Sequence, residues 1–172
     1  MQTSLYSVTV PSFIKTLTKL SGILDKASVY AAEHSLAESE LLDARLAPDM
    51  FPLSKQIQVV CDQAKALAAR LNGTDPVAME DNEKSFAELK ERINKTIELL
   101  NAVAPSDVDG HEGAQVTIKY FPGMYMNGQD YALEYVLPNF YFHAVTAYDI
   151  LRMKGVPLGK ADIASLSLQK LA

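Results

Sequence analysis

The chain has 172 residues, the usual length of one domain built around a single hydrophobic core. Hydrophobic residues make up 48% of it and charged residues 22%, as in ordinary globular proteins. The net charge of -5, without a Lys/Arg-rich run, argues against nucleic acid or an anionic membrane as a partner. No apolar stretch reaches the roughly 18 to 20 residues that span a bilayer. A single cysteine, Cys61, and an N-terminus without a signal-peptide pattern predict a cytoplasmic protein.

The first amphipathic helix is predicted to begin near Pro11, which fits an opening helical turn because its missing N–H costs little there. Its apolar residues recur at spacings of four, three and four and so form one stripe: Phe13, Leu17, Leu20 and Leu24. In the following connection, residues 34 to 52, Ser35 and Glu38 have the spacing of a capping box. They predict a short helix there.

The second and third helices show the same periodicity. Their stripes are Ile57, Val60, Ala64, Leu67 and Leu71, and then Phe86, Leu89, Ile93, Ile97 and Leu100. Asn72-Gly73 is a typical C-terminal stop for the second helix, and the third is predicted to stop before Ala104-Pro105. In the polar link between them, Glu80, Asp81 and Glu83 are interpreted as a charged N-terminal turn that complements the dipole of the third helix.

The fourth helix is predicted from about Gln129 to Lys154, with Gly155 as its stop. Its stripe is Leu133, Val136, Phe140, His143, Ala147 and Leu151. Pro138 lies inside it and predicts a kink or a short broken turn, serving either as a bend around the bundle or as part of a pocket. The connection before it, residues 105 to 128, is long for a bundle, and its segment QVTIKYF predicts a short strand or extended stretch.

These patterns predict an all-α four-helix bundle with a short extended or β element in the last interhelical connection. Residues 1–172 are predicted to form this single domain. Because bundles place ligand and metal sites between facing helices, the candidate functional residues are polar side chains that point inward.

The chain contains three histidines, and no two of them have the spacing of a helical metal-binding pair. His34 is interpreted as an exposed loop residue. His111 is interpreted as part of a solvated turn, although the nearby Asp109 and Glu112 leave a loop site open. His143 is either a histidine at the edge of the core or a pocket ligand assisted by neighbouring polar residues. Cys61 stands near a buried stripe, as a small core hydrophobe would.

Two stretches of the sequence carry a resemblance: RLAPDMFPLSKQIQVVCDQAKALAARLNG and PNFYFHAVTAYDILRMKGVPLGKADI. They look like a functionally uncharacterised bacterial branch of the DinB/YfiT-like superfamily, and the likeness covers essentially the whole chain. Members of this superfamily are helical bundles, and many are regarded as metal-dependent enzymes.

The resemblance also implies where a metal site would lie. The superfamily carries one histidine on its second helix and a His-x-x-x-His pair on its last, which ends in Leu-Arg-x-x-Gly. Leu151, Arg152 and Gly155 match that ending and fix the register. That register places His143 at the second histidine of the pair, Asn139 at the first, and the helix-two ligand near Val59. One ligand of three therefore remains, and one imidazole does not retain a divalent ion against water.

Three functions follow as alternatives. The first is a bundle with a degenerate metal site that binds a small molecule or a partner. In this alternative the chain is not an enzyme and has no cofactor. The second is a metal-dependent enzyme of thiol transferase or hydrolase type that holds Zn or Ni through His143 and non-standard ligands such as Cys61 or His111. The third is a structural or stress-related homodimer, with apolar residues near Tyr125, Met126 and Tyr131 at the interface.

Overall fold

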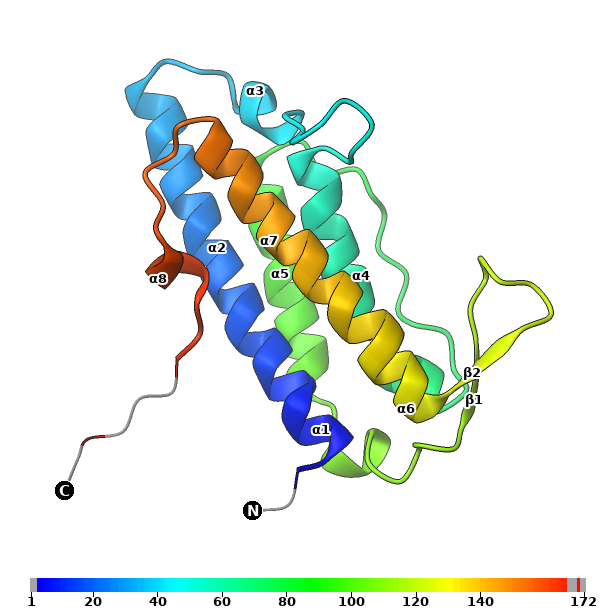
Figure 1. Ribbon diagram of the computed structural model, residues 1–172. Coiled ribbons are helices and arrows are strands. Elements are labelled where there is room, and N and C mark those ends of the chain that lie inside the picture. Colours follow the sequence, from blue (N-terminus) through cyan, green and yellow to red (C-terminus); the bar gives the residue numbers. More distant parts are fainter. Residues whose placement is uncertain (1–2, 167–169, 171–172) are drawn as a thin grey trace.

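The computed structural model describes residues 3–166 and 170 and shows a bundle of four long helices (Figure 1). These helices are α2 (Val10–Glu33), α4 (Leu53–Leu71), α5 (Phe86–Asn101) and α7 (Leu137–Met153). Helix α4 packs along α5 and α7, and α2 packs along the same two helices, so the four enclose one core. The predicted all-α four-helix bundle is confirmed. The short helices are α1 (Leu5–Val8), α3 (Glu38–Leu42), α6 (Gly128–Asp130), α8 (Lys160–Ile163) and the 3-10 turn η1 (Pro105–Asp107).

The predicted apolar stripes of α2, α4 and α5 form the core. Every stripe residue of α2 and α4 is buried, and in α5 only Ile97 is partly exposed. Pro11 lies in the first turn of α2, as predicted. Gly73 follows α4 with a φ of +68°, a left-handed conformation that favours glycine and ends the helix. Among the described residues, no helix is both long and apolar enough to cross a bilayer.

The predicted capping box of Ser35 and Glu38 is wrong. Helix α3 begins at Glu38, and its N-cap is Ala37, whose N–H donates a 2.9 Å hydrogen bond to Oε1 of Glu40. Ser35 instead adopts a positive φ of 54° just after α2, and Oε2 of Glu38 accepts a hydrogen bond from the N–H of Phe86. The short helix is present, but it starts later than the motif predicts.

The last interhelical connection holds a two-stranded antiparallel sheet that projects from the bundle (Figure 1). Strand β1 (Gln115–Thr117) is the extended element predicted from the sequence, and it pairs with β2 (Tyr125–Asn127), which was not predicted. Val116 lies opposite Met126 and is buried against the bundle. The hairpin is thus attached through one face only.

The fourth helix changes its hydrogen-bond pattern before Pro138. It starts as α6, passes through a π-helical segment, η2 (Tyr131–Val136), and continues as α7, with Pro138 in the first turn of α7. The predicted local break therefore takes the form of a π-helical turn. This turn rotates the buried face of the helix, so that Tyr131 is fully buried and Leu133 is 37% exposed. The prediction that Leu133 belongs to the buried stripe is therefore wrong.

Candidate functional site

His143 lies in the middle of α7 and contacts the first turn of α4. Its Nδ1 is 2.6 Å from Oε1 of Gln56, whose Nε2 donates to the carbonyl oxygen of Phe51 at 2.9 Å. Because a carbonyl can only accept, the amide nitrogen of Gln56 must face Phe51 and its oxygen must face His143. Nδ1 of His143 is therefore assigned the hydrogen, and the lone pair of the ring is on Nε2.

Two phenyl rings flank this imidazole. Phe51 lies parallel to it at a centroid distance of 6.3 Å, and Phe142 meets it edge-on at 5.1 Å. The two phenylalanines are 50% and 55% exposed, whereas His143 is 9% exposed. Burial lowers the pKa of His143 below its ordinary value of 6.5, so the ring is mainly neutral at pH 7. The site therefore combines a fixed hydrogen-bond acceptor with an accessible aromatic surface.

The two other positions implied by the superfamily do not offer histidine ligands beside His143. Nδ2 of Asn139, one turn before His143, donates to the carbonyl of Tyr135 at 2.7 Å. The α4 residue that forms a hydrogen bond with His143 is Gln56, about one turn before Val59. The candidate set is thus one imidazole and two amides that already have hydrogen-bond partners, and amides are poor ligands for transition metals.

The proposed substitute ligands do not complete this set. Cys61 is fully buried, and burial raises the pKa of its thiol to about 11, which disfavours the thiolate that binds metals. The backbone of His111 lies against Gly128, at the start of the fourth helix and well before His143. Within the described part of the chain, no three His, Cys, Asp or Glu residues are grouped to hold a metal ion. The residues present do not fit a superfamily-type metal centre.

The remaining predictions about polar residues have mixed outcomes. His34 is exposed at the end of α2, as predicted, and its ring stacks on Tyr30 at a centroid distance of 4.0 Å. Cys61 is a buried core residue, also as predicted. Asp109, near His111 in the sequence, accepts a 2.8 Å hydrogen bond at Oδ1 from the N–H of Tyr6, so one of its carboxylate oxygens ties this loop to α1.

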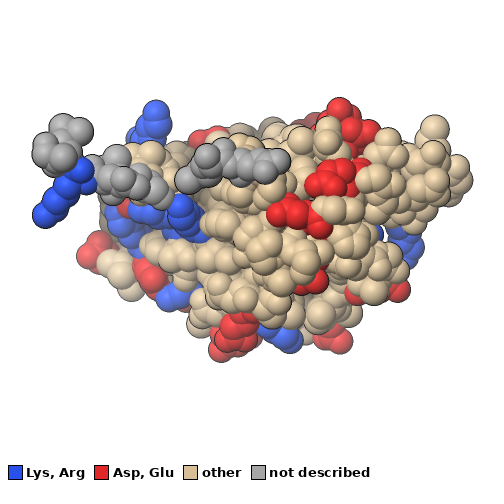
Figure 2. Space-filling model, turned by 90° about the horizontal axis from the view of Figure 1, so that it is seen from below, with Lys and Arg blue, Asp and Glu red and all other residues tan. Residues whose placement is uncertain are grey.

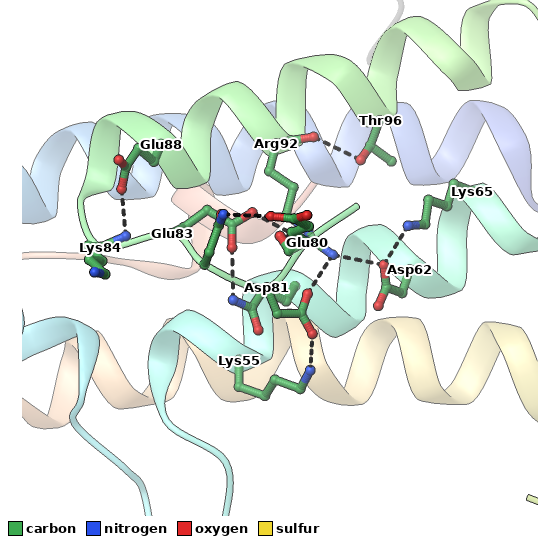
Figure 3. Close-up of polar contacts among 12 residues, drawn as sticks. Lys55, Asp62, Lys65, Glu80, Asp81, Glu83, Lys84, Glu88, Arg92 and Thr96 are labelled. Atoms are coloured by element: carbon green, nitrogen blue, oxygen red, sulfur yellow. Dashed lines mark hydrogen bonds and ion pairs between the residues drawn. The ribbon is translucent and has the colours of Figure 1, made fainter. Parts of the chain in front are cut away.

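A charged cluster around the buried Arg92 was not predicted from the sequence (Figure 3). Arg92 projects from α5 and is 4% exposed. Its Nη2 lies 2.9 Å from Asp62 and 3.0 Å from Asp81, and its Nη1 lies 2.8 Å from Glu83. Nη1 also donates to the main-chain carbonyl of Glu80 at 3.0 Å. Arg92 therefore joins α4, α5 and the link between them.

This cluster corrects the interpretation of the acidic link. Asp81 and Glu83 bind Arg92 instead of completing the first turn of α5, which is capped by Ser85 and contains Glu88. Burial disfavours the charge on Arg92, but the hydrogen bond to Glu83 and the charges of Asp62 and Glu83 outweigh it and raise the pKa. The sequence did contain one indication of this cluster: Arg92 directly precedes Ile93, a position that was predicted to be buried.

Comparison with known proteins supports the fold and leaves the activity open. A family model described as a domain of unknown function (DUF1993) matches residues 5–164. A solved structure of a DinB family member protein from Shewanella denitrificans is 37% identical and has a TM-score of 0.91, over 98% of this chain and 96% of that chain. No curated protein matches. The match over nearly the whole chain places this DinB-like bundle in the DUF1993 family.

Proposed function

We propose that the chain is a small-molecule-binding bundle whose ligand site is the His143 imidazole and its two flanking phenyl rings. The observation that carries the proposal is the 2.6 Å contact between Gln56 and His143. It orients the ring, fixes the hydrogen on Nδ1 and leaves Nε2 as an acceptor. A buried imidazole with a fixed tautomer, whose Nε2 has no hydrogen-bond partner among the described residues, is suited to binding an O–H or N–H group.

The surroundings define the chemical class of the ligand. Phe51 and Phe142 offer half-exposed rings on which an aromatic or other flat apolar group can pack. A ligand of this class places its ring against them and donates one hydrogen bond to Nε2 of His143. Such binding weakens below the pKa of His143, because protonation converts the acceptor nitrogen into a donor.

The hydrogen bonds of Gln56 and Asn139 favour small-molecule binding over a metal-dependent thiol transferase or hydrolase. Gln56 and Asn139 each have an internal hydrogen-bond partner, so neither is a free ligand for Zn or Ni. We propose a chain that needs no metal cofactor. A reducing, cytoplasmic location is consistent with the single buried thiol of Cys61.

The test compares phenol with anisole, which has the same ring but no O–H donor. We expect phenol to shift the Nε2 resonance of His143 saturably in ¹⁵N NMR spectra, and anisole to leave that resonance in place. The backbone amide of Phe142 provides a signal that is present in every variant: His143→Phe should remove its preferential response to phenol over anisole, whereas His34→Gln, which changes an exposed histidine, should retain that preference.

Two results would overturn the proposal. One is a phenol titration that leaves the His143 resonance unchanged. The other is elemental analysis of untagged protein, purified without chelator, that finds one Zn or Ni per chain which disappears in His143→Ala. That second result would restore the metal-dependent enzyme.

The surface of the hairpin supports homodimer formation as a second candidate property. Four large side chains near its tip are 50% to 83% exposed: Tyr120, Phe121, Met124 and Tyr125. Of the interface residues predicted from the sequence, Tyr125 lies in this patch, whereas Tyr131 is fully buried and cannot contribute. Lys119 is the one charged residue in segment 115–127 of a chain with a net charge of -5. Figure 2 shows the mainly uncharged surface on the right, where the hairpin projects in Figure 1.

We propose that a second copy of the chain covers this patch, because two acidic chains repel least where neither carries acidic groups. Sedimentation velocity should show a dimer for the wild type and a monomer for a double variant with Tyr120→Ser and Met124→Ser. Val29→Ser, which changes an exposed apolar residue on α2, should remain dimeric. A wild type that is monomeric at tens of micromolar would contradict the assembly.

A further inference from the structure

A cleft lies at the other end of α4 from His143. It has a volume of about 180 Å³ and is lined by residues from the last turn of α4, the following link and β1. The polar side chains in this lining are Arg70, Thr74, Asp75, Gln115 and Thr117. Gln56, which contacts His143, is in the first turn of α4, so the two sites are separated by the length of that helix.

Arg70 and Asp75 line this cleft without pairing with each other. Neither forms an ion pair within the described residues, although Arg70 is partly buried. Nη1 of Arg70 donates a long hydrogen bond, 3.3 Å, to the neutral hydroxyl of Tyr131. A partly desolvated guanidinium gains most from an anionic acceptor, and the remaining donors of Arg70 form the fork that binds carboxylates.

The neighbouring polar groups add acceptors. Thr74 donates its hydroxyl hydrogen to the carbonyl of Ala69 at 2.9 Å, so its oxygen is left to accept a hydrogen bond. The carboxylate of Asp75 is acceptor-only at neutral pH. The cleft thus presents a positive group for an anion and acceptors for a cation, within one small volume.

We propose that this cleft binds a free amino acid with a short side chain. The ligand carboxylate binds the guanidinium of Arg70, and its ammonium binds Asp75 and the hydroxyl oxygen of Thr74. A zwitterion satisfies both charged residues, whereas a simple anion would be repelled by Asp75. The volume lies below the roughly 300–1,000 Å³ of pockets for drug-sized molecules, which favours a small ligand.

The experiment titrates the full chain with L-serine and with two compounds that each lack one of its charged groups. Ethanolamine has no carboxylate, and 3-hydroxypropionate has no ammonium. Glycine and L-alanine complete the panel. We expect the three amino acids to shift the Nε–Hε signal of Arg70 and the backbone amide of Asp75 saturably in ¹⁵N–¹H NMR spectra, and the two single-charge compounds to bind at least about tenfold more weakly.

Matched variants assign the charges. Arg70→Gln should weaken L-serine binding at least about tenfold, and Asp75→Asn should remove the preference for L-serine over 3-hydroxypropionate. Lys119→Gln, which removes a positive charge outside the cleft, should bind as the wild type does. A folded wild type whose Arg70 signal responds to none of the three amino acids would overturn the proposal. Equal binding of L-serine and 3-hydroxypropionate in the wild type would also overturn it and indicate a plain carboxylate site.

Discussion

Gly128 lies directly against the main-chain carbonyl of His111. A Cβ atom added to Gly128 would be 2.0 Å from that oxygen and 2.8 Å from Cδ2 of Leu71. The N–H of the next residue, Gln129, donates to the carbonyl of Glu112 at 2.9 Å. The last interhelical connection is therefore fastened to the start of the fourth helix at a point where no side chain fits.

Gly128→Ala should lower the free energy of unfolding by about 1–3 kcal/mol, because the contact is with backbone and the connection must move to make room. Gly22→Ala is the matched control. Gly22 lies within α2 and has nothing within 4 Å of an added Cβ, so alanine there should stabilise the chain by about 0.5–1 kcal/mol. Urea unfolding measures both changes, and a Gly128→Ala variant as stable as the wild type would contradict this packing.

Arg92→Met should destabilise the chain by about 3 kcal/mol, at the lower end of the range for breaking a buried ion pair. The variant leaves Glu83, whose side chain is 9% exposed, without its cation, and it releases the link from α5. The lower end applies because Asp62 and Asp81 are each more than one third exposed and water screens their charges.

Lys90→Met is the control for this prediction, because Lys90 pairs with the exposed Asp25 at the surface. It should change the free energy of unfolding by less than about 0.5 kcal/mol. Urea unfolding of both variants at low and moderate salt provides the comparison. Losses of equal size in the two variants would show that the Arg92 cluster contributes no more than a surface pair.

The pKa of His143 makes stability depend on pH. Burial lowers this pKa in the folded state, so below the ordinary value of 6.5 the unfolded chain binds more protons than the folded one. The contribution is fully present above pH 6.5 and is lost as the pH falls through the folded-state pKa. The free energy of unfolding should therefore decline more steeply on acidification in the wild type than in His143→Gln.

Chemical unfolding at a series of pH values from 7.5 to 4.5 tests this difference. His34→Gln is the control, because His34 is exposed and should leave the wild-type slope unchanged. If His143→Gln has the same slope as the wild type, the imidazole is not held neutral by burial.

The helices could be predicted because each buried stripe is defined by residues that lie only a few positions apart in the sequence. The stripe through Phe13, Leu17 and Leu20 indicates a helix and its buried face from a few turns of sequence, and all three residues are fully buried. The π-helical turn was not predictable from the period. It rotated Leu133 out to the surface while Tyr131 became buried, and only Pro138 indicated an irregularity.

The candidate site was predictable only in part, because its contacts join distant segments. The resemblance placed His143 and Asn139 on one helix, but the contact with Gln56 depends on how α4 packs against α7. The same holds for Arg92, whose partners come from α4 and from a link without secondary structure. Periodicity within one helix carries no information about either pairing.

Cys61 should be unreactive in the folded chain. It is fully buried, and burial raises the pKa of its thiol to about 11, although the nearby Thr96 hydroxyl and the charge of Arg92 act in the opposite direction. Since the thiolate is the reactive form, DTNB should label native protein at pH 8 only as fast as the chain opens, and label one thiol at once in urea. Ser106→Cys, made at an exposed position, should add one thiol that reacts quickly in the native state. Rapid labelling of one thiol in the native wild type would instead show that solvent reaches Cys61 without unfolding.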